Sequence, residues 1–160
     1  MVQKIFIFKI FLIIFIFNNS PILAKNIIGL AKIIDGDTVY INNNKIRLHG
    51  IDAPEKNQLC FYNKIKWPCG KQSSNELEKI INNEILKCST IDIDKYGRYV
   101  AICYKNNLDI NKIMVRKGWS IAYRYYSKDY IRDENYARLK KIGIWKSKFE
   151  EPYKFRKKNK

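Results

Sequence analysis

A turn with two symmetrically placed cysteines gives the strongest constraint on how this chain folds. Residues 88–103 read CSTIDIDKYGRYVAIC, and their turn, at residues 94–97, is equally distant from Cys88 and Cys103. Alternating and β-branched residues flank the turn, which is typical of a β-hairpin. The simplest register places the two cysteines opposite each other, so we expect a disulfide between the two strands of this hairpin.

The first 24 positions have the layout of a secretory signal peptide. Lys4 and Lys9 precede an apolar run at residues 10–17, and a polar break follows before Ala24. We therefore expect cleavage after Ala24 and a mature chain that is exported, to a periplasm or out of the cell, without stable membrane association. The alternative is a retained membrane anchor, although the apolar run is shorter than the ~20 residues that a spanning helix needs.

The cysteines number four, and an even set in an exported chain favours disulfides over free thiols. If Cys88 pairs with Cys103, Cys60 is left for Cys69, and this second bond would close a short loop. Zinc is the competing use of cysteine. However, the sequence has no C-x-x-C pair, and its lone His49 lies outside the spacing typical of a zinc site. The connectivity remains an inference, because four cysteines allow more than one pairing.

The remaining pattern predicts one compact α+β domain, mainly β, over residues 25–150. Strands are expected at residues 27–34, 38–41 and 45–51, in addition to the two strands of the hairpin. Five strands in three-plus-two order, with about three helices between them, fit a small OB-type barrel, a fold often used to bind nucleic acid.

Helices are expected at residues 73–83, 108–117 and 128–142. Ser73 and Glu76 fit a capping box at the start of the first helix, and a glycine follows each of the other two. Residues 151–160 form a basic tail, which we expect to be mobile and to add charge more than structure.

The charge balance indicates a polyanionic partner. Lys and Arg number 31 against 15 Asp and Glu, for a net charge of +16 over 160 residues. Such a field attracts nucleic acid, although the same lysines could simply keep a small protein soluble. Charge describes affinity and not chemistry, so the reaction has to be inferred from motifs.

Residues 33–55 gather four carboxylates, Asp35, Asp37, Asp52 and Glu55, around Arg47. Two hard carboxylates close together in a site exposed to water suit calcium or magnesium better than a soft metal. Arg47 and Asp52 are an odd number of positions apart, so both reach one site only if the strand bends between them. Gly50 is suited to that bend. The alternative is that DGD is only a turn and DAPE only a strand exit.

Five ordered motifs resemble the staphylococcal nuclease (thermonuclease) family. They are IDGDTV, IRLHGIDAPE, DKYGR, VRKGWSIAYRYY and GIW, and the similarity extends over residues 27–145. The resemblance implies an OB-fold, calcium-dependent endonuclease that hydrolyses DNA and RNA, single- or double-stranded, with little sequence specificity. The cysteine-bearing loop at residues 58–70 resembles an exported bacterial branch of that family.

The resemblance also assigns the metal ligands and the base, position by position. Asp37 and Asp52 match the calcium carboxylates of the family. Ala53 stands where the family uses a main-chain carbonyl as a further calcium ligand. Glu55 matches the residue regarded as the general base for the attacking water.

The same matching assigns the residues that contact the substrate. Arg47 and Arg98 match the two arginines that hold the scissile phosphate, and Lys95, Tyr96 and Tyr123 match residues near the nucleotide phosphate and ring. The chemistry agrees, because hydrolysis adds charge to an anionic phosphorus centre that a cation and forked arginine donors can stabilise. Alternatively, Arg98 is an ordinary turn residue paired with Asp94.

Other functional classes stay open at this point. Histidine-based ribonuclease chemistry needs well-placed imidazoles, and we interpret the single His49 as structural or peripheral. One alternative is a catalytically weak nucleic-acid-binding OB-fold module, which predicts a missing base or metal carboxylate. Another is an exported adhesion or membrane-surface protein that binds anionic lipids. For the nuclease we expect a monomer.

Overall fold

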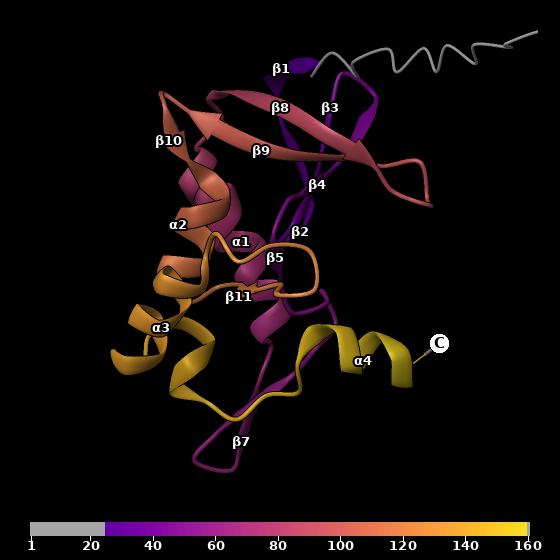
Figure 1. The fold of residues 1–160 in the computed structure, drawn as a ribbon. Helices are drawn as coiled ribbons and strands as arrows, with labels where there is room; N and C mark the ends of the chain where they lie inside the picture. Colours follow the sequence, from indigo (N-terminus) through magenta and orange to yellow (C-terminus); the bar gives the residue numbers. More distant parts are fainter. Residues whose placement is uncertain (1–24, 160) are drawn as a thin grey trace, which may run out of the picture.

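The computed structural model describes residues 25–159 (Figure 1). The expected signal peptide and its cleavage site lie outside these residues. Seven strands form the main sheet, in the order β1-β8-β9-β4-β3-β2 with β10 paired to β9. They are β1 (Asn26–Leu30), β2 (Lys32–Asp35), β3 (Thr38–Ile41), β4 (Asn44–Leu48), β8 (Ile85–Ile93), β9 (Tyr99–Lys105) and β10 (Leu108–Asp109).

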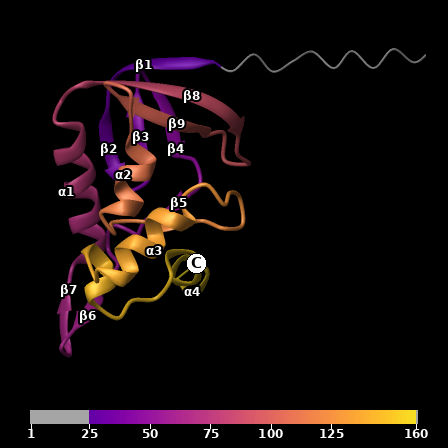
Figure 2. The same cartoon turned by 60° about the vertical axis from the view of Figure 1, so that its left-hand side comes forward.

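The sheet curls because consecutive strands lie at its two ends. The single strand expected at residues 27–34 is interrupted at Ala31, so that β1 pairs with β8 whereas β2 pairs with β3. β4 pairs in parallel with β9, and this pairing joins the N-terminal strands to the hairpin. The result is a curled half-barrel, which confirms the expected α+β, mainly β fold of OB type (Figures 1 and 2).

The bend expected at Gly50 is present. β4 ends at Leu48, Gly50 has a φ of 70°, and the chain resumes as β5 (Ile51–Asp52), which pairs with β11 (Ile121–Ala122). Glycine adopts positive φ without steric cost, so Gly50 lets the chain leave the main sheet here. The expected strand at residues 45–51 is therefore two strands, and Asp52 lies on the second.

Both disulfides are formed with the expected connectivity, Cys60–Cys69 and Cys88–Cys103. Cys88 lies directly opposite Cys103 in the β8–β9 register. The Cys60–Cys69 bond closes a hairpin that was not expected, made of β6 (Cys60–Tyr62) and β7 (Ile65–Trp67). Its turn residues Asn63 and Lys64 both have positive φ, which a two-residue hairpin turn requires.

Helix α1 (Cys69–Ile81) begins four residues earlier than expected, and the capping-box prediction is wrong. Ser73 lies inside the helix, fully buried, and its hydroxyl donates a hydrogen bond to the carbonyl of Trp119 at 2.8 Å. The helix starts directly after Pro68, where the disulfide fixes Cys69. Leu77 and Ile81 face the core.

Two further helices agree with the expected positions but are shorter. They are α2 (Ile110–Arg116) and α3 (Ile131–Leu139), and a short 3-10 helix, η1 (Gly143–Lys146), follows α3. The side chain of Asp109 caps α2 by accepting a hydrogen bond from the Lys112 N–H at 2.9 Å. Helices α1 and α2 lie against the curled sheet, and α3 lies below it, next to α2 and β11 (Figure 2). Of the helices between residues 25 and 159, none combines the length and apolar character needed to cross a bilayer.

The C-terminal segment differs from the mobile tail that we expected. Residues Pro152–Lys158 form helix α4, which lies on the side of the molecule next to β5 and the loop after β11 (Figures 1 and 2). Pro152, at the start of the helix, is buried. Proline at this position favours a helix start, because its fixed φ suits the first turn and its missing N–H is not needed there.

Candidate active site

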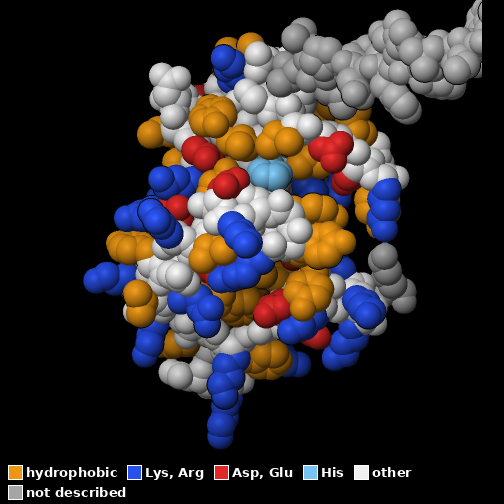
Figure 3. Space-filling model, in the orientation of Figure 1, with side chains coloured by type: hydrophobic (Ala, Val, Ile, Leu, Met, Phe, Trp, Pro, Cys, Tyr) orange, Lys and Arg blue, Asp and Glu red, His pale blue; other side chains and the backbone are white. Residues whose placement is uncertain are grey.

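A cleft of about 950 Å³ gathers most of the residues that the sequence singled out. The turn between β8 and β9, the loop after β11 and helix α4 contribute to its wall. Among the lining side chains are Asp35, Asp37, Arg47, Glu55, Lys95, Tyr96, Arg98, Tyr123 and Arg156. On the face shown in Figure 3, Lys and Arg side chains are spread over the surface, with few acidic groups among them.

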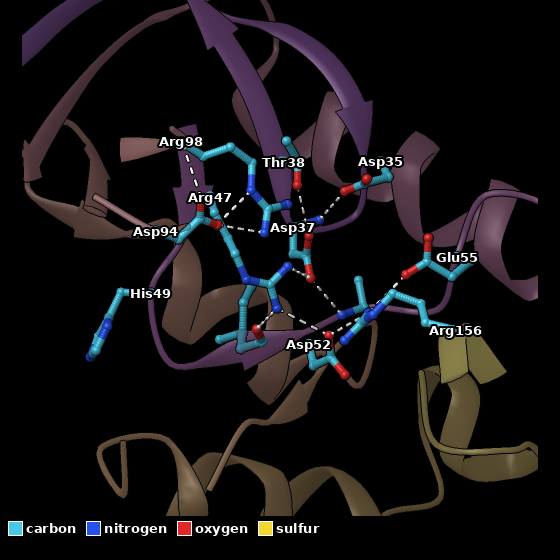
Figure 4. Close-up of polar contacts among 12 residues, drawn as sticks. Asp35, Asp37, Thr38, Arg47, His49, Asp52, Glu55, Asp94, Arg98 and Arg156 are labelled. Carbon is cyan, nitrogen blue, oxygen red and sulfur yellow. Dashed lines mark hydrogen bonds and ion pairs between the residues drawn. The ribbon is translucent and has the colours of Figure 1, made fainter. Parts of the chain in front are cut away.

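Arg47 lies between the two carboxylates matched to metal ligands. Its Nη1 donates to Asp37 Oδ2 at 3.0 Å and its Nη2 to Asp52 Oδ1 at 3.1 Å (Figure 4). The side chains of Asp37 and Asp52 are almost wholly buried. The bend at Gly50 thus brings Arg47 and Asp52 into one site, although strict strand alternation would have pointed them apart.

Both oxygens of Asp37 accept hydrogen bonds. Thr38 Oγ1 donates to its Oδ1 at 2.9 Å, and the Ala53 N–H donates to its Oδ2 at 3.1 Å, beside the bond from Arg47. Burial would raise the pKa of the Asp37 carboxyl, but the Arg47 charge and these hydrogen bonds outweigh it and hold the pKa below its usual value. Asp37 is therefore a carboxylate at neutral pH.

Asp52 has one oxygen without a partner. Its Oδ2 is buried and accepts no hydrogen bond from any residue between 25 and 159, whereas its Oδ1 receives Arg47. Burial, followed by the negative charge of Asp37, raises the pKa of the Asp52 carboxyl despite the two nearby arginines. A buried oxygen of this kind is costly unless a further positive group or donor meets it.

Asp35 adds to the excess of negative charge. Its Oδ1 accepts the Asp37 N–H at 3.0 Å, and burial together with the charge of Asp37 raises the pKa of Asp35 to about 7. The carboxylates therefore repel one another in a partly buried place. A cation at this point would relieve the repulsion.

These residues fit a hard divalent cation. Asp37, Asp52 and the Ala53 main chain lie together, and the unpaired Asp52 Oδ2 offers a free oxygen ligand of the type that calcium prefers. Between residues 25 and 159, no three His, Cys, Asp or Glu side chains converge as a ready-made metal site. A cation here would thus complete its coordination with main-chain, water or substrate oxygens.

Glu55 lies at the mouth of the site and contacts a residue that sequence reasoning missed. Its side chain is 31% exposed, and its Oε1 accepts a hydrogen bond from Arg156 Nη1 at 2.8 Å. The same nitrogen lies 2.8 Å from Asp52 Oδ1 (Figure 4). The one available sequence signal was Pro152, which is typical of the first position of a helix and predicts that the basic tail is ordered.

Arg98 is paired with Asp94 in the β8–β9 turn, as the alternative interpretation expected. Its Nε and Nη2 both lie 2.7 Å from Asp94 Oδ2, and Asp94 Oδ1 accepts the N–H groups of Tyr96 and Arg98. Burial opposes ionisation of Asp94, but the Arg98 bonds outweigh it and lower the pKa of the carboxyl. The pair holds Arg98 within the cleft, on the same side as Arg47 (Figure 4).

Aromatic and basic side chains surround the acidic centre. Lys95 Nζ lies 5.2 Å from the ring centroid of Tyr96, which is 64% exposed at the tip of the turn. The guanidinium of Arg47 lies 5.8 Å from the ring of Tyr123, and Tyr153 of α4 stacks on Tyr123 at a centroid distance of 6.4 Å. Exposed rings beside cations are suited to nucleobases next to phosphates.

His49 lies at the edge of the cleft. Its Nε2 is 3.9 Å from Asp129 Oδ2, and its main-chain carbonyl accepts a hydrogen bond from the Asn111 side chain at 3.0 Å. The imidazole does not contact the carboxylates matched to the metal, which agrees with its interpretation as peripheral.

The fold and the cleft define a basic OB-type protein whose site combines buried carboxylates, arginines and exposed tyrosines. Comparison with known proteins identifies the family more narrowly. Residues 45–147 match the family described as "Staphylococcal nuclease homologue". The chain belongs to the staphylococcal nuclease family.

Individual relatives agree with this assignment. "Staphylococcal-like nuclease CAN1" of Arabidopsis thaliana is 35% identical over 147 residues, which cover 88% of this chain and 43% of the relative. An "Uncharacterized endonuclease" of Haemophilus influenzae is 30% identical over 152 residues, covering 91% of this chain and 80% of the relative. These similarities support a nuclease, and hence hydrolase, function for the chain.

One further relative is not named as a nuclease. "Succinoglycan biosynthesis protein ExoI" of Rhizobium meliloti is 30% identical over 131 residues, which cover 79% of this chain and 69% of the relative. The chain also spans less than half the length of the plant relative described above. Family membership therefore leaves the substrate, the metal and the roles of individual residues to be argued from the site itself.

Proposed function

We propose that this protein is a calcium-dependent endonuclease that hydrolyses phosphodiester bonds in DNA and RNA with little sequence specificity. The observation that carries the proposal is the buried carboxylate pair of Asp37 and Asp52, joined by Arg47, beside a cleft that Asp37, Arg47, Glu55 and Arg98 line. Asp52 Oδ2 has no hydrogen-bond partner among residues 25–159. The pair offers carboxylate oxygens for a cation next to arginines that a phosphate in the cleft would meet.

Asp37, Asp52 and the main-chain carbonyl of Ala53 are the residues that would hold the cation. Their oxygens are hard ligands, which suit calcium better than a soft metal. When bound, calcium neutralises phosphate charge and orients a water molecule for attack. The four carboxylates Asp35, Asp37, Asp52 and Glu55 outnumber the two arginines that pair with them, Arg47 and Arg156, and a divalent cation would offset this excess.

Glu55 is the proposed general base. Its carboxylate is partly exposed, so water can reach it, and it lies within one ion-pair network with Asp52. A carboxylate next to a bound water can remove the proton of that water as the phosphorus centre is attacked. As the water oxygen bonds to phosphorus, the bond from phosphorus to one ester oxygen breaks, and that oxygen takes up a proton from solvent. Glu55 returns its own proton to solvent, because its side chain is partly exposed.

Arg47 and Arg98 are the proposed phosphate-binding residues. Arg47 is already fixed by Asp37 and Asp52, so it presents its guanidinium without further ordering. Arg98 exchanges part of its pairing with Asp94 for the phosphate, whose charge increases in the transition state. Lys95, Tyr96 and Tyr123 would then contact the adjacent phosphate and the base, without reading a particular sequence.

The test is degradation of plasmid DNA and of a structured RNA by the purified protein in calcium, compared with the same protein in EDTA. Cleavage of both substrates in calcium alone is expected. Binding without cleavage in either condition would instead favour the nucleic-acid-binding module. Capture by anionic vesicles, together with absence of turnover, would favour the membrane-surface alternative.

We also propose that a monomer consisting of one nuclease domain, residues 25–150, followed by the basic C-terminal segment, acts after export. The two disulfides support this location, because such bonds persist in oxidising compartments. Intact mass of the protein recovered from the producing cell should correspond to a chain that starts at Lys25 and has no reactive thiol. A retained leader would contradict both the cleavage and the export.

A further inference from the structure

Helix α4 brings a third arginine into the active site. The helix starts at Pro152, and Arg156, one turn later, extends from it toward the carboxylates (Figure 4). The Arg156 side chain is 31% exposed, so most of it is enclosed by the cleft. None of the motifs that carry the family resemblance includes this residue.

A single nitrogen of Arg156 contacts both of the acidic residues that the proposed function needs. Nη1 lies 2.8 Å from Asp52 Oδ1 and donates a hydrogen bond of 2.8 Å to Glu55 Oε1. Asp52 is a proposed cation ligand and Glu55 is the proposed base. The guanidinium therefore sets the distance between the group that holds the cation and the group that takes the proton.

The contact leaves the cation ligand free. Arg47 and Arg156 both approach Asp52 Oδ1, at 3.1 and 2.8 Å. Asp52 Oδ2 has no hydrogen-bond partner among residues 25–159. Because both arginines lie beside Oδ1, neither of them occupies the second oxygen of this buried carboxylate.

The rest of the segment holds Arg156 in place. Tyr153 stacks on Tyr123 with an interplanar angle of 26°, and the carbonyl of Glu150 accepts a hydrogen bond from Gln58 Nε2 at 2.6 Å. Gln58 itself is fully buried, and its Oε1 accepts the Glu55 N–H at 3.2 Å. The Gln58 side chain thus links Glu150, just before α4, to Glu55, which Arg156 contacts.

We propose that Arg156 is a positioning residue of the nuclease site, which holds Glu55 and Asp52 by one oxygen each and makes α4 part of the active site. The inference rests on the proposed function. The positive charge of Arg156 lies beside a cation ligand, so Arg156 weakens calcium binding by repulsion. Arg156 also speeds the reaction, because it fixes the position of the base. These two effects have opposite signs, and a residue that only supports the fold does not separate them.

The test compares Arg156→Ala with Lys158→Ala, which removes one positive charge from the same helix at an exposed position. Calcium binding is measured by titration calorimetry without nucleic acid, and cleavage is measured in single turnovers at saturating calcium. For Arg156→Ala we expect calcium affinity roughly 3- to 10-fold tighter, from the lost repulsion. We also expect cleavage roughly 10- to 100-fold slower, the usual effect of losing a residue that orients active-site ligands. Lys158→Ala should match the parent in both measurements.

Other outcomes overturn the proposal. Faster cleavage by Arg156→Ala, together with tighter calcium binding, would show that Arg156 inhibits the reaction. Cleavage by this variant at the parent rate would show that the contact is only a surface ion pair. Slower cleavage with weaker calcium binding and a lower melting temperature would make α4 a support of the fold.

A second variant, Arg156→Lys, keeps the charge but loses the planar fork. It should bind calcium like the parent and recover part of the turnover. If it instead behaves like Arg156→Ala in both measurements, charge is not what Arg156 contributes and the proposal fails. If the parent protein itself cleaves no substrate, the proposed function fails, whereas the calcium titration still decides whether Arg156 controls the carboxylate pair.

Discussion

Gly70, the second residue of α1, packs directly against the main-chain carbonyl of Glu55. A Cβ at position 70 would lie 1.6 Å from the Glu55 oxygen, far inside any tolerated contact. The Gly70 N–H also donates to the Gln58 carbonyl at 3.2 Å. The start of the helix that follows the Cys60–Cys69 disulfide is therefore one wall of the turn that carries the proposed base.

Gly70→Ala should consequently move Glu55. We expect the free energy of unfolding to fall by roughly 1–3 kcal/mol, as in other overpacked sites, and turnover to fall with it. Urea unfolding and single-turnover cleavage measure the two effects. Lys71→Ala, at an exposed position in the same turn of helix, is the matched control and should change neither.

Glu55→Gln should lower kcat by roughly 10²- to 10⁴-fold, which is the usual contribution of a general base. The amide keeps an oxygen that can accept the Arg156 hydrogen bond, so folding and nucleic-acid binding should remain close to those of the parent. Binding is measured by fluorescence anisotropy and cleavage in single turnovers at saturating calcium. A well-folded variant that cleaves at the parent rate would remove Glu55 from the mechanism.

Asp94→Asn should destabilise the protein in a pH-dependent way. The pKa of Asp94 is lowered in the folded state, so its contribution is complete above the unfolded pKa of about 3.9 and is lost as the pH falls through the folded pKa. At pH 7 we expect a loss of roughly 1 kcal/mol, since the pair with Arg98 is largely enclosed. The unfolding free energies of the two proteins should begin to converge as the pH falls below about 4, and a constant difference down to pH 2 would contradict the assignment.

The two disulfides should have different effects on activity. Replacing Cys60 and Cys69 by serine should lower both stability and turnover, because this bond borders the Glu55 turn. Replacing Cys88 and Cys103, which lie in the β8–β9 core and do not line the cleft, is the matched control and should lower stability alone, by roughly 3 kcal/mol for a loop of this size. Equal turnover losses would show that the Cys60–Cys69 bond has no special relation to the site.

Binding to duplex DNA should weaken steeply with salt. Each phosphate that the protein neutralises contributes about −0.9 to the slope of log K against log salt. Lys95→Ala should therefore reduce that slope by about 1, whereas Lys79→Ala, on the exposed face of α1, should leave it unchanged. Anisotropy titrations in EDTA measure binding without cleavage. Strong binding of one sequence at high salt would instead indicate a specific recognition module.

Local patterns predicted those parts of the fold that local interactions decide. The Cys88–Cys103 register followed from a turn with equal arms, and the bend at Gly50 followed from the odd spacing of Arg47 and Asp52. The division of the first strand at Ala31 was not predictable in this way. It depends on which distant strand each half pairs with, and isoleucines on both sides of the break suit a strand equally well.

The errors have physical causes as well. Ser73 and Glu76 have the spacing of a capping box, but the Ser73 hydroxyl finds a tertiary partner in the Trp119 carbonyl and the helix extends past it. The β6–β7 hairpin turns at Asn63-Lys64, a weaker signal than Asn-Gly for the same backbone.

The proposed site also contains residues that local motifs predict and one that they do not. Asp37, Arg47 and Glu55 lie in one short segment whose motif could be recognised, and the structure brings them into one cleft. The contact between Glu55 and Arg156 joins positions 101 residues apart, and no local pattern encodes such a pairing.

The hydrogen bonds of Gln58 have a consequence for the order in which the protein assembles. The buried amide of Gln58 hydrogen-bonds both the Glu55 N–H and the Glu150 carbonyl. Phe61 and Lys148 exchange main-chain hydrogen bonds as well, so two segments that are distant in sequence are joined by these contacts. Contacts of such long sequence separation close late, because the loop between them must be ordered first. We therefore expect the barrel to form before the site is complete, and a chain shortened before α4 to fold without the contact between Arg156 and Glu55.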